Sequence, residues 1–310
     1  MPIIKKNDIM PERPVIIVLY GVPGSGKTSL ATTAENPIVI DTDRGYDRAV
    51  QRVDTLTAQK WQDVIAEYET IKGYSTVVVD TAKSAIDDYL AAYVCEQNYK
   101  LRTNTLKRFG AMADEFKQFV NTLRSNGSDI IFICHDKETQ EGDTIKHAPD
   151  CTGQSKDLLI RIADQVGYVF IQNKQRVINF EPLDNFVGKN VAQLGMIPIP
   201  GAPSKEFDTC MADIIKTVKQ SIQSKSEAQR MAQEMLTQLR ENLAEASTEK
   251  GVEVIMKQAR DLPPVLKAPF FAEAKEALAA KGFVFDAEKK KFVKAQTDET
   301  SEAPREGDTD

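Results

Sequence analysis

Residues 21–28 read Gly-Val-Pro-Gly-Ser-Gly-Lys-Thr, a complete pattern of glycine, four residues, glycine, lysine and threonine. We call this segment the phosphate loop. It follows an apolar run at residues 15–20, which predicts a buried parallel strand, and residues 27–32 predict the first turns of a helix. A strand, a glycine-rich turn and a helix in this order form a site for phosphate groups, because backbone N–H groups at the helix start face the anion. The pattern therefore predicts an α/β domain with a nucleotide site.

Each residue type in the phosphate loop has a chemical reason. The three glycines, Gly21, Gly24 and Gly26, allow backbone N–H groups to turn toward the β- and γ-phosphates. Lys27 adds a mobile positive charge, and the hydroxyl of Thr28 can ligate Mg²⁺. We therefore predict ATP and Mg²⁺ as cofactors. The predicted nucleotide-contacting residues are Gly21, Val22, Pro23, Gly24, Ser25, Gly26, Lys27, Thr28 and Ser29.

Length and composition indicate a soluble protein of more than one part. A chain of 310 residues accommodates an α/β domain of about 200 residues and a smaller region. No apolar stretch reaches about 18 residues, and the first residues become polar at once, so we expect a cytoplasmic protein without membrane contact. The cysteines lie far apart, which favours free thiols in a reducing compartment. They are Cys95, Cys134, Cys151 and Cys210.

Charge is concentrated at the C-terminal end. The formal net charge is −6, and the last fifteen residues contain six acids and one arginine, which gives −5 for this segment alone. The remainder is close to neutral, so the overall sign says little about nucleic-acid binding. We predict that residues 295–310 form an acidic disordered tail.

Apolar strands alternate with amphipathic helices along the first two thirds of the chain. This alternation predicts a mostly parallel sheet with helices on both faces. A helix capped by Thr57 is expected after the second strand, and later strands at 166–171 and 175–180 are expected at an edge or in a hairpin. Clustered prolines place the end of this domain at residue 203. The expected regions are an ATPase core at 1–203, a helical accessory region at 204–294 that ends in a small hairpin, and the tail.

Two aspartates follow strands at the edge where the phosphate loop is expected. Asp80 ends the third strand, at residues 76–80, where its carboxylate can accept hydrogen bonds from a Mg²⁺-bound water and from the hydroxyl of Thr28. Asp43 lies two residues past the second strand, at residues 37–41, within reach of a γ-phosphate. We predict that Asp80 binds the metal and that Asp43 orients the attacking water.

Three segments resemble successive core segments of RecA-like recombinase ATPases. They are Ile-Asp-Thr-Asp-Arg-Gly-Tyr-Asp at 40–47, Val-Val-Val-Asp-Thr-Ala-Lys-Ser at 77–84, and Ile-Phe-Ile-Cys-His-Asp at 131–136. The resemblance implies a RecA-like P-loop fold in which the carboxylate of Asp43 activates water, although the family usually has a glutamate there. It also implies that His135, at the end of the fourth strand, senses the γ-phosphate.

The same resemblance implies DNA contacts. The segment between Tyr99 and Phe109 corresponds to the first DNA loop of the family, and cations flanked by aromatic residues suit a single strand. Residues 137–153 correspond to the second DNA loop by position. Residues 149–153 and 164–168 resemble phage-encoded RecA-like ATPases that promote single-strand annealing. The predicted DNA-contacting residues are Lys100, Arg102, Lys107 and Arg108.

Basic residues after the last core strands correspond to those that RecA-like subunits present to a neighbour's nucleotide. Lys189 is the best match, with Lys174 and Arg176 as further candidates, and this implies a homo-oligomer. A zinc site formed by His135, His147, Cys151 and Cys134 is disfavoured, because no closely spaced pair of cysteines is present and adjacent Cys134 and His135 alternate across a strand.

The sequence thus predicts an ATP- and Mg²⁺-dependent ATPase of phage or prophage type that binds single-stranded DNA during recombination or annealing. A single-strand-binding protein is a possible partner of such an enzyme. Two alternatives remain. One is a small-molecule kinase, which needs a lid that carries arginines. The other is an ATP-binding regulatory or assembly factor with slow hydrolysis and a helical region that recruits a partner.

Overall fold

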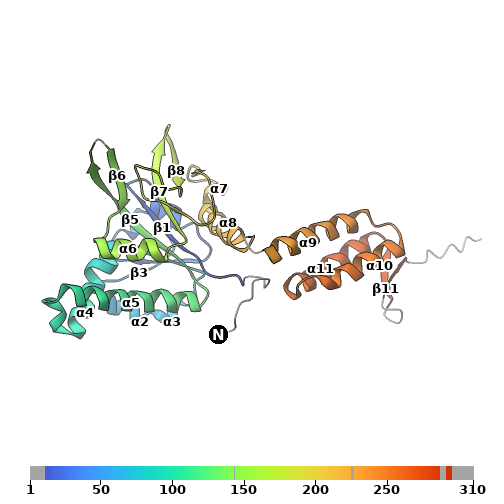
Figure 1. Cartoon of the computed structure of the whole chain (residues 1–310), viewed down its shortest axis with the longest axis horizontal. Coiled ribbons are helices and arrows are strands. Elements are labelled where there is room, and N and C mark those ends of the chain that lie inside the picture. Colours follow the sequence, from blue (N-terminus) through green and yellow to red (C-terminus); the bar gives the residue numbers. More distant parts are fainter. Residues whose placement is uncertain (1–10, 143, 225–226, 287–290, 295–310) are drawn as a thin grey trace, which may run out of the picture. The chain divides into compact units, whose positions relative to one another are not determined.

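The computed structural model describes residues 11–142, 144–224, 227–286 and 291–294. The described chain forms two compact units, which divide between residues 223 and 224 (Figure 1). The first unit contains the sheet, and the second contains the C-terminal helices. The predicted acidic tail at 295–310 lies outside the described residues.

A mostly parallel sheet forms the centre of the first unit, as the alternation of strands and helices predicts. Six strands run parallel in the order β3-β2-β4-β5-β1-β7, and β8 and β10 continue this edge antiparallel. The hairpin strand β6 pairs with β5, and β9 pairs with β7. The strands are β1 (Ile16–Gly21), β2 (Pro37–Asp41), β3 (Asp54–Thr57), β4 (Thr76–Asp80), β5 (Asp129–Glu141), β6 (Thr144–Pro149), β7 (Gln165–Gln172), β8 (Gln175–Asn179), β9 (Lys189–Asn190) and β10 (Ile197–Pro198).

Helical segments connect these strands. Their bounds are α1 (Lys27–Ala31), η1 (Tyr46–Arg48), α2 (Trp61–Ala66), α3 (Tyr68–Ile71), η2 (Ser84–Leu90), α4 (Ala91–Gln97), η3 (Tyr99–Arg102), α5 (Thr105–Ser125), α6 (Gly153–Ile162), α7 (Lys205–Asp208) and α8 (Cys210–Ser224).

The predicted cap at Thr57 is wrong. Thr57 ends strand β3, which pairs in parallel with β2. Helix α2 starts later, and the carboxylate of Asp63 accepts hydrogen bonds from the backbone N–H groups of Gln59 (2.9 Å) and Lys60 (3.1 Å). The residues expected to cap the helix form strand β3 instead, because their backbone groups hydrogen-bond to those of β2.

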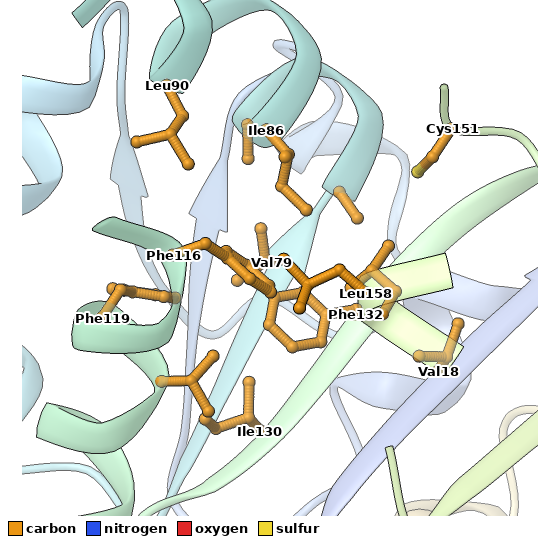
Figure 2. Close-up of a cluster of buried hydrophobic side chains, with 14 of the residues drawn as sticks. Val18, Val79, Ile86, Leu90, Phe116, Phe119, Ile130, Phe132, Cys151 and Leu158 are labelled. Atoms are coloured by element: carbon orange, nitrogen blue, oxygen red, sulfur yellow. The ribbon is translucent and has the colours of Figure 1, made fainter. Parts of the chain in front are cut away.

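The two faces of the sheet bury two different sets of side chains. Along β1, Ile16, Val18 and Tyr20 enter one core, and Ile17 and Leu19 enter the other, because successive strand residues point to opposite faces. Figure 2 shows the first core, where aromatic and aliphatic side chains from α5, α6 and η2 meet those from β1, β4 and β5. Residues labelled there are Val18, Val79, Ile86, Leu90, Phe116, Phe119, Ile130, Phe132, Cys151 and Leu158.

The second core corrects the predicted domain boundary after residue 203. Helix α8 places Met211 and Val218 in the core that contains Ile17 and Leu19 of β1. The side chain of Lys219, also on α8, pairs with Asp129 at the start of β5 (2.9 Å). The apolar stripe of α8 is therefore buried against the sheet, and the helix belongs to the sheet unit. The sequence predicted helices here but not the surface that covers this one.

The C-terminal unit consists of helices and one hairpin, as predicted. Its core combines apolar side chains from α9, α10 and α11 with Phe283 of the hairpin. Within the described ranges, no helix has both the length and the apolar character needed to cross a membrane. The elements are α9 (Glu227–Glu245), α10 (Glu249–Gln258), η4 (Ala259–Asp261), α11 (Pro264–Ala280), β11 (Phe283–Asp286) and β12 (Lys291–Lys294).

Candidate nucleotide-binding site

A cavity of about 350 Å³ lies at the carboxyl ends of the parallel strands. Its walls come from the phosphate loop after β1, the loop after β2, the end of β4, the part of β5 where its parallel pairing ends, and the start of β8. In an open α/β sheet, ligands bind outside the carboxyl ends of the strands. Nine of the predicted catalytic and nucleotide-contacting residues line this cavity: Pro23, Gly24, Gly26, Lys27, Thr28, Ser29, Asp43, Asp80 and His135.

The backbone of the phosphate loop needs its glycines. Gly24 (φ 79°) and Gly26 (φ 92°) adopt left-handed conformations that side chains with a Cβ rarely take. Gly21 needs space instead: a Cβ there would lie closer than 3.0 Å to the carbonyl oxygen of Val169 on β7. The backbone conformation and the packing of the loop therefore account for these three glycines.

The Lys27 side chain crosses the phosphate loop. Its Nζ donates hydrogen bonds to the carbonyl oxygens of Gly21 (2.8 Å) and Val22 (3.0 Å), and the residue is 6% exposed. Burial lowers the pKa of Lys27, and the nearby carboxylate of Asp80 opposes this shift. The ammonium group is thus held inside the loop that is expected to surround the phosphates.

Thr28 and Asp80 meet across the cavity. The Thr28 hydroxyl donates a hydrogen bond to Oδ2 of Asp80 (2.7 Å). Burial raises the pKa of Asp80, whereas the hydrogen bond from Thr28 lowers it. A hydroxyl and a carboxylate side by side at the end of a phosphate loop are oxygen ligands of the kind that Mg²⁺ takes, so these residues fit a magnesium ion.

The loop after β2 is folded around Asp41. The buried carboxylate of Asp41 accepts hydrogen bonds from the backbone N–H groups of Asp43 (3.0 Å), Gly45 (3.2 Å) and Tyr46 (3.0 Å). These bonds hold Asp43 at the cavity, where its Oδ2 lies 3.8 Å from Nε2 of His135. The predicted water-orienting residue and the predicted sensor are therefore neighbours. Sequence reasoning did not single out Asp41 as their support.

Arg176 is the main site residue whose position differs from the expectation. It was expected to reach a neighbouring subunit, but it lines the cavity of its own chain. Its Nε lies 3.3 Å from the point where a Cβ on Gly26 would be. The hairpin predicted at residues 166–180 provided a signal for this position. Its first strand, β7, runs parallel to β1, so the turn lies at the carboxyl edge of the sheet. The first residues of β8 therefore lie near the phosphate loop.

Lys189 makes contacts within its own chain. Its Nζ donates hydrogen bonds to the carbonyl oxygens of Ile160 and Arg161 (both 3.0 Å) at the end of α6. Carbonyl groups at a helix end lack partners within the helix, so a lysine amine stabilises them. The side chain thus has a structural use within its own subunit, and a role toward a neighbour's nucleotide stays a prediction.

The predicted DNA-contacting segment is helical rather than a loop. Lys100 and Arg102 lie on η3, Lys107 and Arg108 lie in the first turn of α5, and none of the four lines the described walls of the phosphate cavity. Tyr99 is 72% exposed, as a stacking residue would be. In contrast, Phe109 packs partly against the core, so of the two expected aromatic side chains only that of Tyr99 is largely exposed to solvent. Likewise, the second expected DNA loop is mostly the β5–β6 hairpin.

Comparison with known proteins gives the family. A protein family described as an AAA domain matches residues 13–191, which is more than half of the chain and includes every wall of the cavity. The chain therefore belongs to this family of ATPase domains. Among solved structures it is similar to the RadB recombinase, with 16% sequence identity, 54% of this chain and 81% of that chain covered, and a TM-score of 0.35. No curated protein matches the sequence.

Proposed function

We propose that this chain is an ATPase whose nucleotide state controls binding to single-stranded DNA, and that it acts as a homo-oligomer in recombination or annealing of phage or prophage type. The observation that carries the proposal is the convergence of Lys27, the Thr28–Asp80 pair and the Asp43–His135 pair on one cavity. Phosphate binding, metal binding, water orientation and γ-phosphate sensing each have a side chain of suitable chemistry there.

Each residue has a specific task in this proposal. Lys27 and Arg176 hold the phosphate oxygens, and Thr28 and Asp80 hold Mg²⁺. The bound metal supplies positive charge that offsets the charge of the phosphate oxygens during hydrolysis. Asp43 accepts a hydrogen bond from the attacking water, and the imidazole of His135 donates one toward the γ-phosphate.

Replacing the proposed water-orienting carboxylate provides one test. We expect Asp43→Asn to reduce kcat for ATP hydrolysis about 100-fold, since positioned acid–base groups contribute about 10²–10⁴-fold. Nucleotide affinity should stay the same, because the phosphate loop is unchanged. Steady-state hydrolysis and calorimetric ATP titration measure the two quantities. Asp43→Glu is the matched variant and should retain turnover. Equal kcat for Asp43→Asn and the original chain would exclude this role.

The segment from Tyr99 to Arg108 supports the DNA part of the proposal. Four cations lie on exposed or partly exposed positions next to exposed Tyr99. The first turn of α5 contains no acid, so its basic side chains add to the positive end of the helix dipole. Such a surface suits the phosphates of a flexible strand, with Tyr99 available for stacking on a base.

Charge reversal on this surface tests the DNA contacts. We expect Arg102→Glu combined with Lys107→Glu to weaken single-strand binding about tenfold or more at low salt, because two phosphate contacts are lost. The slope of log affinity against log salt should become shallower by about 1.4, at about 0.7 per contact. Fluorescence anisotropy with a labelled oligonucleotide measures both. Lys117→Glu, on an exposed position further along α5, should leave both values unchanged. An unaltered slope in the double variant would contradict the assignment.

One experiment separates the proposal from the two alternatives. ATP hydrolysis is measured with single-stranded DNA, duplex DNA, RNA or no nucleic acid at two salt concentrations. Stimulation by single strands that weakens with salt supports the proposal. Transfer of phosphate to a small acceptor would instead indicate a kinase. Slow hydrolysis that no nucleic acid stimulates, together with a stably associated protein partner, would indicate a regulatory or assembly factor.

A further inference from the structure

The β5–β6 hairpin places three metal-ligating side chains together, and none of them is among the residues that line the phosphate cavity. Asp136 and Glu138 are two residues apart on β5 and therefore point to the same face. His147 of β6 is the cross-strand partner of Glu138. One ligand atom from each of the three lies within 4.8 Å of the others.

The Asp136 carboxylate is buried in a way that calls for a cation. Its side chain is 2% exposed. Oδ2 lies 2.6 Å from Nδ1 of His147 and accepts a hydrogen bond from the hydroxyl of Tyr168 (3.3 Å). Oδ1 is buried and has no hydrogen-bond partner among the residues that the structure describes. A buried carboxylate oxygen without a partner is costly, and a bound cation would satisfy it.

The imidazole of His147 is held in place before any ligand binds. Its ring stacks on the ring of Tyr168, with centroids 5.0 Å apart and an angle of 25°. Its backbone donates to the carbonyl of Asn185 (2.8 Å) and accepts from the N–H of Val187 (3.0 Å). A metal-ligating side chain that is already fixed by packing and by its neighbours' hydrogen bonds loses little conformational freedom when it coordinates an ion.

We propose that Asp136, Glu138 and His147 bind a divalent transition-metal ion, zinc or manganese. One imidazole nitrogen and two carboxylate oxygens suit these ions, and water can complete the coordination because Glu138 lies at the exposed rim. The proposed site contains no cysteine ligand. Cys134 and Cys151 are buried and interact with each other. Since Asp136 directly follows His135 on β5, the ion would fix the base of the hairpin next to the residue that faces the phosphate cavity.

Glu138→Gln tests the site without disturbing its hydrogen bonds. The variant removes one charged ligand but keeps the contacts among Asp136, His147 and Tyr168. The full-length chain is stripped with a chelator, returned to chelator-free buffer without nucleotide, and titrated calorimetrically with Zn²⁺ or Mn²⁺. We expect one equivalent to bind and to raise the melting temperature. In Glu138→Gln the affinity should fall about tenfold or more, and the rise in melting temperature should be lost.

A second carboxylate on the same hairpin provides the control. Glu141 pairs with Lys146 and is not part of the cluster, so Glu141→Gln should bind the ion as the original chain does. The proposal is overturned if the original chain binds neither ion, or if Glu138→Gln binds with unchanged affinity. The second result would place the ion elsewhere, for example at Thr28 and Asp80. Because no readout uses ATP hydrolysis or DNA, the outcome is independent of the proposed function.

Discussion

Lys27→Ala is expected to lower ATP turnover about 10²–10³-fold. Loss of one preorganised donor that stabilises developing charge typically costs this much, and Lys27 is the cation at the centre of the phosphate loop. Its Nζ is already held between the carbonyls of Gly21 and Val22, within the loop itself. Turnover is measured by phosphate release at saturating ATP, and ATP affinity by calorimetry. Both should fall, because the lysine contacts phosphate oxygens before and during the reaction.

Two measurements keep this result interpretable. Lys83→Ala removes a partly exposed lysine that pairs with Asp150 (2.7 Å) and does not line the cavity, so its turnover should match that of the original chain. The melting temperature of Lys27→Ala shows whether the loop remains folded without its internal amine contacts. A folded Lys27→Ala protein with normal turnover would remove the phosphate loop from the catalytic site and, with it, the proposed function.

The parts of the fold that the sequence predicted are those encoded by local patterns. The run at residues 15–20 is apolar throughout because both faces of β1 are buried, and this feature is visible without the structure. The runs that became β2 and β4 are read in the same way. Their alternation with helices then implies parallel pairing, since a chain that passes through a helix returns in the same direction.

The predictions that were wrong concern surfaces brought together from distant parts of the chain. Residues 204–224 were predicted as part of the helical accessory region, but Met211 and Val218 of α8 are buried in the core of the sheet unit. Thr57 has good capping chemistry, yet pairing with β2 made it a strand residue. Local propensity could not decide either case, because tertiary contacts set the outcome.

The same distinction applies to the candidate site. Residues 21–28 and Asp80 follow strands directly, so their positions could be predicted from the sequence. Asp41 supports the loop through its own buried carboxylate, which a linear pattern does not reveal. Arg176 reaches the phosphate loop only because β7 and β8 pair beside β1. Lys189 has suitable charge and position in sequence, but the end of α6 uses its amine.

Gly21→Ala is expected to destabilise the sheet unit and to weaken nucleotide binding. A Cβ at this position would lie closer than 3.0 Å to the carbonyl oxygen of Val169. That carbonyl belongs to β7, which pairs with β1, so relief requires the two strands to move apart. Overpacking that forces atoms to shift typically costs about 1–3 kcal/mol, and a contact this short with backbone lies at the upper end, about 3 kcal/mol. For a unit of about 200 residues, this corresponds to a fall in melting temperature of about 6–12 °C.

A glycine elsewhere in the unit separates the effect of the steric clash at Gly21 from the effect of a glycine-to-alanine change itself. Gly110 lies within α5, and a Cβ there would meet no atom within 4 Å, so Gly110→Ala should stabilise the protein by about 0.5–1 kcal/mol. Thermal unfolding followed by circular dichroism compares the two variants with the original chain. If Gly21→Ala unfolds at the original temperature, the start of the phosphate loop does not pack against β7. In that case the position of Arg176, which follows from the β7–β8 hairpin, would lose its structural basis.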